Sequence, residues 1–341
     1  MKNLPFILIA VFLFTSCTSR KMYSDSEQYS PEDDKFIDSN FPNSEKSLWS
    51  LIKWGLFSTR ETWPKWIDIK PQPKLITPSK NQVNITLINH STFFLQFEDM
   101  NILTDPIWSE RTSPVQWAGP KRVHKPGLNM DELNKVDVVI ISHNHYDHLD
   151  TASLEKLEAL YSPLFIVPLG DKELLTSLGI EKVVELDWWE ELDFNENKIT
   201  FTPNQHWSKR GLFDHNKSLW GGYVISVKGK QVYFAGDTGY TKYFKDIFTK
   251  FGAMELSLLP IGAYEPRWFM QAFHMDPEEA IWAHKDLQSK KSIGTHYGTF
   301  QLTNEARKDP QRKLKMYMPS NGLKPEDFIT IEPGVSELFS L

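Results

Sequence analysis

The sequence predicts an α/β fold in which mixed β-sheets are covered by helices, and two features of the 341-residue chain carry this prediction. The first is a meander: apolar residues alternate from Val83 to Leu87, and strand-like segments follow at 93–97 and 102–104. The second is the alternation of strand and helix patterns over the rest of the chain. A meander followed by such alternation is typical of sheets with helices on their outer faces.

The alternating elements are short and have clear bounds. We expect helices at 154–161, 172–178, 240–251 and 277–287, and strands at 164–168, 183–188, 199–201, 223–227 and 232–235. Pro71, Pro73 and Pro78 separate this main domain, 79–341, from what precedes it. No internal repeat or low-complexity segment interrupts the main domain.

The N-terminus has the pattern of a bacterial lipoprotein leader, expected at 1–17. Lys2 precedes an apolar stretch, 4–14, that has the length of a signal peptide rather than of a membrane span. The stretch ends in Thr15-Ser16-Cys17, which resembles a lipobox, and Cys17 is the only cysteine. We therefore expect lipidation at Cys17 and a lipid-anchored protein of the bacterial cell envelope, facing the periplasm or in the outer membrane. The alternatives are an ordinary cleaved signal or a short anchor.

The segment 18–78 is expected to be polar first and aromatic-rich afterwards. Residues 18–43, rich in Ser, Asp, Glu and Lys, are typical of a solvated tether. The apolar spacing of 48–57 predicts a short amphipathic helix, which either packs on the main domain or enters the lipid interface.

The composition limits the classes of partner. The net charge of −6 supplies no basic surface for a phosphate backbone, so nucleic acid is not expected as a partner. Twelve tryptophans and 22 phenylalanines indicate a large aromatic core, or else an apolar groove or membrane contact.

The densest group of titratable side chains is Ser-His-Asn-His-Tyr-Asp-His at 142–148, directly after an apolar strand-like run. Side chains two apart in an extended chain share a face, so His143 and His145 can bind one ion together. A turn into the next helix, with Asp150 as its N-cap, carries Asp147 and His148 towards a second position. Imidazoles and a carboxylate suit Zn²⁺ where thiolates are absent. The alternative is a loop of surface histidines.

Three later strand ends each offer one more residue that can bind a metal. These residues are His206, Asp237 and His296, and small residues flank the last two, which lets the backbone come close. A single strand-end histidine is more often structural than metal-binding. Together with the 142–148 motif, however, the three complete two ligand shells.

This set of residues resembles the binuclear zinc site of the metallo-β-lactamase superfamily. Six further stretches narrow the resemblance to the branch of N-acyl-phosphatidylethanolamine-hydrolysing phospholipases D. They are LTDPIWSERTSPVQWAGPKR at 103–122, QHWSKR at 205–210, SLWGGYVI at 218–225, AGDTGY at 235–240, FHMDPEEA at 273–280 and GTHYGTF at 294–300. The lipobox is a departure, since the animal enzymes lack it. Asn89 is another, standing before His90 where relatives carry Gly, although Asn tolerates the same positive φ.

The resemblance implies an αββα sandwich of two mixed β-sheets flanked by helices, with 79–341 as the catalytic domain and two Zn²⁺ per chain. One zinc is implied to bind His143, His145 and His206, the other Asp147, His148 and His296, with Asp237 bridging them. The implied reaction is attack by a hydroxide shared by both ions on the phosphorus of a phospholipid substrate of the N-acyl-phosphatidylethanolamine type. The implied products are an N-acylethanolamine and phosphatidic acid.

The resemblance also gives roles to residues near the metals. Asp147 and His274 are the implied catalytic residues, with His274 contacting phosphate or protonating the leaving group. The alternative for His274 is a structural histidine before the helix start at Asp276 and Pro277. Gln116 and Trp117 are implied to shape the substrate channel. We expect His90 to brace the site without binding metal, and the remaining histidines to be structural or on the surface: His124, His215 and His284.

Two alternative functions stay open. Another hydrolase of the superfamily, such as a lactonase or a soluble phosphodiesterase, would share the ligands and differ in its pocket. There, five aromatic residues either form an acyl-accepting groove or belong to the core: Trp207, Trp220, Trp268, Phe269 and Phe273. The second alternative is a membrane-tethered envelope protein whose metal site only stabilises the fold. The ligand set argues against it, because it is typical of an open, catalytic metal site. The absence of a Gly-x-Ser-x-Gly motif speaks against a serine hydrolase.

Overall fold

The computed structural model describes residues 23–41 and 47–341, so the lipidation site expected at Cys17 lies outside the described residues. Within these ranges no helix combines the length and the apolar character that a membrane span requires.

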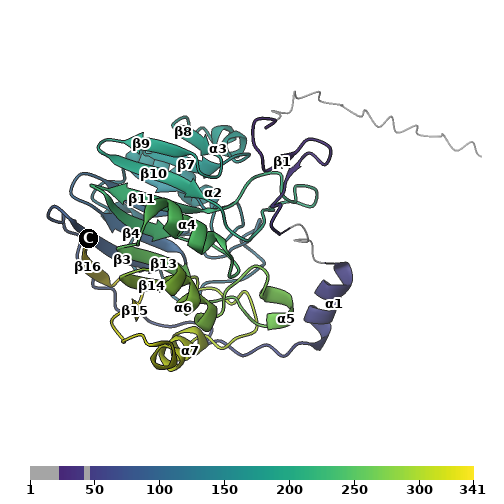
Figure 1. Ribbon diagram of the computed structural model, residues 1–341. Helices are drawn as coiled ribbons and strands as arrows, with labels where there is room; N and C mark the ends of the chain where they lie inside the picture. Colours follow the sequence, from purple (N-terminus) through teal and green to yellow (C-terminus); the bar gives the residue numbers. More distant parts are fainter. Residues whose placement is uncertain (1–22, 42–46) are drawn as a thin grey trace, which may run out of the picture.

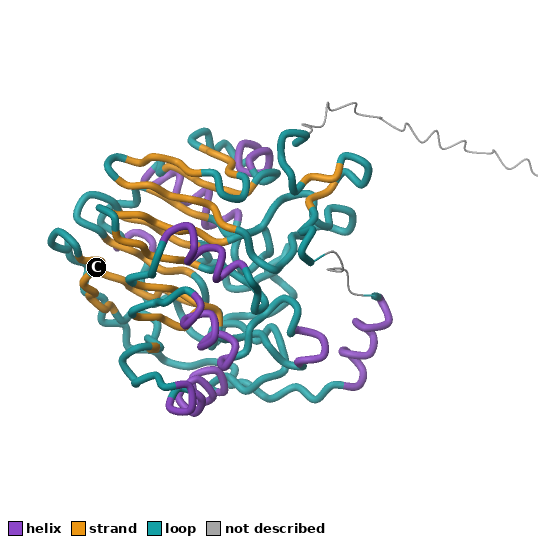
Figure 2. The backbone as a smooth tube through the Cα atoms, viewed as in Figure 1, coloured by secondary structure: helices purple, strands orange, loops and turns teal. Residues whose placement is uncertain are grey.

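Two seven-stranded mixed sheets form the centre of the fold (Figures 1 and 2). The first has the order β16-β3-β4-β5-β6-β7-β8 and is antiparallel up to β5 and parallel beyond it. Its strands are β3 (Gln82–Asn89), β4 (Thr92–Gln96), β5 (Asn101–Thr104), β6 (Val138–Ile140), β7 (Leu164–Pro168), β8 (Val183–Leu186) and β16 (Ser336–Ser340). Within its antiparallel part, β3, β4 and β5 form the meander that the alternating pattern predicted.

The second sheet has the order β15-β14-β13-β12-β11-β10-β9, antiparallel from β9 to β12 and parallel from β12 to β15. Its strands are β9 (Glu191–Phe194), β10 (Asn197–Thr202), β11 (Gly222–Val227), β12 (Lys230–Phe234), β13 (Leu256–Pro260), β14 (Lys291–Thr295) and β15 (Phe328–Ile329).

Alternate residues of each strand point into different hydrophobic layers, which makes the fold a four-layer sandwich. Ile85 and Leu95 of the first sheet meet Phe201 and Ile225 of the second in the central core. The first sheet's outer face packs on α2 (Thr151–Tyr161) and α3 (Lys172–Ser177), and the second's on α4 (Tyr243–Phe251), α6 (Pro277–Asp286) and α7 (Asp309–Tyr317). The predicted αββα arrangement is therefore confirmed.

The remaining short elements lie outside the four layers. They are β1 (Tyr29–Ser30), β2 (Lys35–Phe36), α1 (Leu48–Phe57), α5 (Arg267–Met270) and two 3₁₀ turns, Met130–Glu132 and Pro319–Asn321. The helix predicted at 48–57 is confirmed as α1, which lies beside α5 at the side of the sandwich (Figure 1).

The expectation of a solvated tether is wrong for residues 23–41. Phe36 is fully buried in the central core and contacts the rings of Tyr23 and Tyr29. The Tyr243 hydroxyl of α4 donates to Asp38 at 2.6 Å. The polar composition concealed four aromatic residues, Tyr23, Tyr29, Phe36 and Phe41, whose contacts order the segment 23–41.

Candidate metal centre

The seven residues expected to bind metal come from four strand ends and meet in one place. The 142–148 motif lies between β6 and α2, while His206, Asp237 and His296 follow β10, β12 and β14. Their ligand-type atoms fall into overlapping groups in which all atoms lie within 4.8 Å of one another. The strands of both sheets thus deliver side chains to a common edge of the sandwich.

Three imidazole nitrogens converge in the first group. His143 Nε2 and His206 Nε2 lie 2.9 and 3.3 Å from His145 Nδ1. The Ser142 hydroxyl donates to Asp105 at 2.6 Å and therefore accepts from His143 Nδ1 at 2.9 Å. His206 Nδ1 donates to the Phe273 carbonyl at 3.1 Å. Both histidines consequently carry their proton on Nδ1 and direct the Nε2 lone pair inward, which is the arrangement that a metal ion needs.

The second group combines carboxylates with imidazoles. Asp147 Oδ2 lies 3.2 Å from His296 Nε2 and 3.4 Å from His148 Nε2. Asp237 Oδ2 lies 3.0 Å from His296 Nε2, 3.2 Å from His148 Nε2 and 4.0 Å from His206 Nε2. Asp237 therefore reaches both groups, as a bridging ligand must.

His90 lies within the second group rather than behind it. Its Nε2 is 3.2 Å from Asp147 Oδ2, as near as that of His296, so its expected bracing role takes the form of direct contact with a ligand. The positive φ expected at Asn89 falls on His90 instead, at 46°. Asn89 ends β3, and its side-chain amide donates to the Ile107 carbonyl at 2.9 Å.

Burial and charge set the protonation states of the metal-free cluster. Burial lowers the pKa of His145 to about 4 and that of His143 and His206 well below the ordinary value. Burial alone would raise the pKa of Asp147 and Asp237, but His148 and His296 beside them hold both well below the usual range. Burial would lower the pKa of His148 and His296, but Asp237 and Asp147 raise the pKa of His148 well above its ordinary value and that of His296 to about 9. The first group is therefore neutral, whereas a divalent cation at the second group would take the place of the protons on these two imidazoles.

The polar atoms at the centre also fit a metal. Among the described residues, buried Asp237 Oδ1, His148 Nε2 and His274 Nδ1 have no hydrogen-bond partner. Buried polar atoms normally have one, and these three belong to residues of the groups whose nitrogen and oxygen ligand atoms lie within 4.8 Å of one another. Such a donor set is the one Zn²⁺ accepts without thiolates.

Sequence reasoning missed the residues that hold the ligands in place. Asp105, at the end of β5, accepts from His148 Nδ1 at 2.6 Å and from Ser142 N at 2.7 Å. Arg210 donates to the carbonyls of Asn144 and Leu149, at 2.8 and 2.7 Å, and so closes the loop that carries the motif. Asp105 carried a usable signal, because it is another acidic residue at a strand end. Asp150 occupies the predicted N-cap position, but its carboxylate accepts from Ser109 and from the Ser153 hydroxyl rather than from a backbone amide of the helix.

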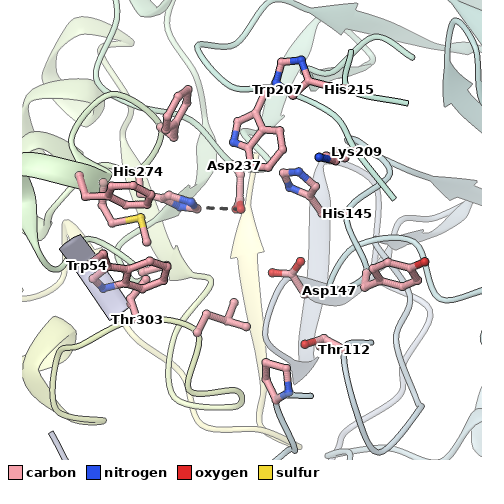
Figure 3. Close-up of a pocket in the computed structure, with 17 residues that line it drawn as sticks. Trp54, Thr112, His145, Asp147, Trp207, Lys209, His215, Asp237, His274 and Thr303 are labelled. Carbon is pink, nitrogen blue, oxygen red and sulfur yellow. Dashed lines mark ion pairs between the residues drawn. The ribbon is translucent and has the colours of Figure 1, made fainter. Parts of the chain in front are cut away.

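A cavity of about 640 Å³ opens over the cluster (Figure 3). Its floor is formed by His145, Asp147, Asp237 and His274, and Lys209 is its one Lys or Arg side chain. No carboxylate of the described residues pairs with the Lys209 ammonium within 4 Å. The walls are largely apolar and comprise Trp54, Trp207, Phe269, Met270, Phe273 and Leu302.

The cavity accounts for some of the other expected site residues. His274 lies in it, with Nδ1 3.8 Å from Asp237 Oδ2 (Figure 3). Of the five aromatic residues considered for an acyl groove, Trp207, Phe269 and Phe273 line the cavity, whereas Trp220 is core and Trp268 lies outside.

The sequence also led to expectations for three other histidines and for Gln116 and Trp117. His215 lines the cavity, stacked on Trp207, although it was expected to be structural or on the surface. His124 and His284 are buried and hydrogen-bonded, as expected of structural residues. The loop predicted to shape the channel reaches the cavity through Thr112 and Pro120 rather than through its expected residues, Gln116 and Trp117. Gln116 hydrogen-bonds the Arg111 backbone, and Trp117 is 83% exposed.

Comparison with known proteins agrees with this fold and with the presence of a metal site. Residues 100–297 match the beta-lactamase superfamily domain. The chain is 38% identical, over 75% of its length, to N-acyl-phosphatidylethanolamine-hydrolyzing phospholipase D 1 of Caenorhabditis elegans, of which it spans 76%. It is 40% identical, over 82% of its length, to the mitochondrial N-acyl-phosphatidylethanolamine-hydrolyzing phospholipase D of Saccharomyces cerevisiae, of which it spans 65%.

Solved structures share the fold. The metallo hydrolase Igni18 of Ignicoccus hospitalis superimposes with a TM-score of 0.59 at 25% identity, covering 76% of this chain and 99% of its own. An isothiocyanate hydrolase from Delia radicum gut bacteria gives a TM-score of 0.60 at 23% identity, with coverage of 76% and 100%.

Proposed function

The chain belongs to the beta-lactamase superfamily, in the branch of its phospholipase D relatives, and on this premise we propose that it is a zinc-dependent phosphodiesterase for N-acyl-phosphatidylethanolamine-type phospholipids. The protein is a hydrolase of the metallo-β-lactamase fold, a metal-dependent family. The proposal adds the metal, its number and the substrate.

The residues that would hold two zinc ions are the two converging groups and the aspartate between them. One ion would take His143, His145 and His206, the other Asp147, His148 and His296, and Asp237 would serve both. When bound, the ions supply Lewis acidity that activates water and neutralises charge on phosphate oxygens.

The protein's own residues then position the reacting groups. Asp147 lines the cavity and stays ionised, since neighbouring histidines lower its pKa, so it can accept a hydrogen bond from the attacking water. Burial lowers the pKa of His274 to about 4, so this imidazole is neutral at pH 7. We assign it a hydrogen bond to the leaving N-acylethanolamine oxygen, because its ring faces the cavity beside Asp237.

The observation that carries the substrate class is the combination of Lys209 with apolar walls. A phosphodiester brings one negative charge into the cavity, and a cation without a carboxylate partner suits it. The acyl chains of a phospholipid match the tryptophan, phenylalanine and methionine side chains around it. A neutral lactone would leave the Lys209 ammonium without a counter-charge.

We also propose that Cys17 is lipidated and holds the protein on a membrane of the bacterial cell envelope. The proposal rests on the apolar stretch 4–14 and the small residues before Cys17. Mass spectrometry of the membrane-extracted protein tests it: a mature chain that begins at acylated Cys17 supports the anchor, and an unmodified Cys17 contradicts it.

A substrate panel tests the proposed activity. Purified protein is incubated with N-acyl-phosphatidylethanolamine, a lactone and a water-soluble phosphodiester, each with and without a chelator. We expect chelator-sensitive release of N-acylethanolamine from the phospholipid. Hydrolysis of the lactone alone would refute the lipid substrate while leaving the metal centre intact.

A further inference from the structure

The most exposed large apolar side chains of the described residues are not spread over the surface. Six are at least 70% exposed, and the next is Met316 at 52%. The six are Trp49, Leu56, Phe57, Trp117, Leu212 and Phe213. We call them the rim residues. They lie on only three segments of the chain: α1, the loop 111–121 and the loop 207–216.

Each of these three segments also lines the catalytic cavity. Helix α1 contributes Trp54, the loop 111–121 contributes Thr112 and Pro120, and the loop 207–216 contributes Lys209 and His215, besides Trp207. Figure 3 shows Trp54, Thr112 and His215 on different sides of the cavity. The rim residues therefore stand on segments that approach the cavity from several sides.

The two loops are built to present their exposed tips. The Asp214 carboxylate accepts from the amides of Arg210 and Gly211, at 3.0 and 2.8 Å, which closes the turn that carries Leu212 and Phe213. In the other loop, Gln116 and Arg111 exchange two hydrogen bonds of 3.1 Å through the Arg111 backbone. Trp117 follows this closed pair directly. These side chains are held in water by ordered turns, which calls for a functional explanation.

Helix α1 contacts the cavity wall through Trp54. The Trp54 ring stacks on Phe269 at 5.0 Å, and its Nε1 donates to Asn304 at 3.1 Å. With Trp54 facing the cavity, Trp49, Leu56 and Phe57 remain directed to solvent, at 70, 72 and 76% exposure.

We propose that the rim residues dock the protein on a phospholipid bilayer, with the mouth of the cavity at the level of the headgroups. This inference rests on the proposed function, because a lipid substrate has to pass from a bilayer into the cavity. Tryptophan, phenylalanine and leucine are the residues that insert at the interface between headgroups and acyl chains. Separate projecting tips suit a fluid partner, whereas a second copy of the chain would require a continuous complementary face. This surface is distinct from the anchor proposed at Cys17.

Vesicle binding tests the docking surface without any reaction. The chain from Thr18 onward, which lacks both the apolar leader and the lipidation site, is sedimented with phosphatidylcholine vesicles that contain no substrate. Two double variants in this background are compared with it: Leu212→Ser with Phe213→Ser, and Leu56→Ser with Phe57→Ser. We expect each to weaken binding about tenfold or more, since one inserted large apolar side chain already corresponds to roughly that factor. Met316→Ser, on α7, is the matched control and should bind like its parent.

Two outcomes would overturn the proposal. One is equal vesicle binding by the parent and both double variants. The other is a parent that does not bind vesicles but forms dimers in size-exclusion chromatography, with the rim variants monomeric; the occupant would then be a second copy.

A pair of substrates separates docking from catalysis. The rim variants should lose hydrolysis of N-acyl-phosphatidylethanolamine in vesicles and keep hydrolysis of a water-soluble phosphodiester, with unchanged metal content and Tm. Equal loss on both substrates would contradict a docking role. If the parent hydrolyses neither substrate, the proposed function fails, and the phosphatidylcholine experiment still decides the docking proposal.

Discussion

Asp105 and His148 are both fully buried, and His148 Nδ1 donates a 2.6 Å hydrogen bond to Asp105 Oδ2. This contact fixes the proton of His148 on Nδ1 and turns Nε2 towards Asp147 and Asp237. Ser142 donates its amide and its hydroxyl to the same carboxylate. Asp105 thus orients a ligand of the second group directly and His143 of the first through Ser142.

Asp105→Asn should therefore weaken metal binding without removing any ligand. The amide presents a donor where His148 needs an acceptor, so the imidazole loses its fixed orientation. We expect about a 10- to 100-fold loss of metal affinity, typical of the loss of a residue that orients a metal ligand. A zinc titration monitored by competition with a chromophoric chelator measures it. Asp193→Asn, at a side chain 82% exposed, is the control, and equal affinities for both variants would contradict the role.

Lys209→Met should impair the reaction of anionic substrates selectively. The ammonium is the one Lys or Arg group among the cavity residues, so its loss removes the counter-charge to the phosphodiester. A charge-assisted hydrogen bond is worth about 1.5–3 kcal/mol, which corresponds to a fall in kcat/KM of about 10- to 100-fold. Steady-state kinetics of a soluble phosphodiester provides the measurement. Lys156→Met, at an exposed position of α2, should leave kcat/KM unchanged; equal effects of both variants would argue against Lys209.

Trp54→Ala should change which acyl chains the cavity prefers. The indole forms part of an apolar wall and stacks on Phe269, so its removal widens the cavity there. We expect a rise in KM for long-chain substrates, with kcat much less affected, because the Trp54 ring contacts Phe269 and Asn304 of the wall rather than a residue of the metal cluster. The control variant is Trp49→Ala, on the solvent side of α1. Both variants are assayed with soluble substrates that differ in acyl-chain length. An unchanged chain-length profile would remove Trp54 from the binding surface.

Asp171 predicts a specific pH dependence of stability. Burial raises its pKa from 3.8 to about 7, and Asn144 donates to its Oδ1 at 3.1 Å. Between about pH 4 and 7 the folded protein binds more protons at this site than the unfolded chain, so its contribution to stability is lost as the pH rises. Asp171→Asn removes this dependence. The Tm of the variant minus the Tm of the parent should therefore increase from pH 5 to pH 8. A difference that stays constant over this range would contradict the assignment.

The metal ligands could be predicted from sequence because each stands at the end of a strand whose apolar pattern is plain. β7 was predicted at its observed bounds, and the ligands after β10, β12 and β14 follow equally clear strands. Strands with weaker patterns were missed. β16 lies at the C-terminus and pairs with β3 from more than 200 residues away, which no local pattern reveals.

The parts of the site that depend on distant contacts could not be predicted. Trp54 lines the cavity because it meets Phe269 and Asn304, more than 200 residues along the chain. The same holds for Phe36, whose burial depends on the central core rather than on its polar neighbours. Trp117 and Trp207 both lie between regular elements, yet of the two only Trp207 faces the metal cluster.

The most direct test of the account is stepwise metal reconstitution. The protein is stripped with a chelator, and Zn²⁺ is returned while bound metal and hydrolysis of N-acyl-phosphatidylethanolamine are measured together. We predict binding of about two ions per chain, with activity returning as the second ion binds, and neither full loading nor activity in Asp237→Asn, because Asp237 Oδ2 reaches both ligand groups. Full activity in the stripped protein, or saturation at a single ion, would contradict a two-ion hydrolase.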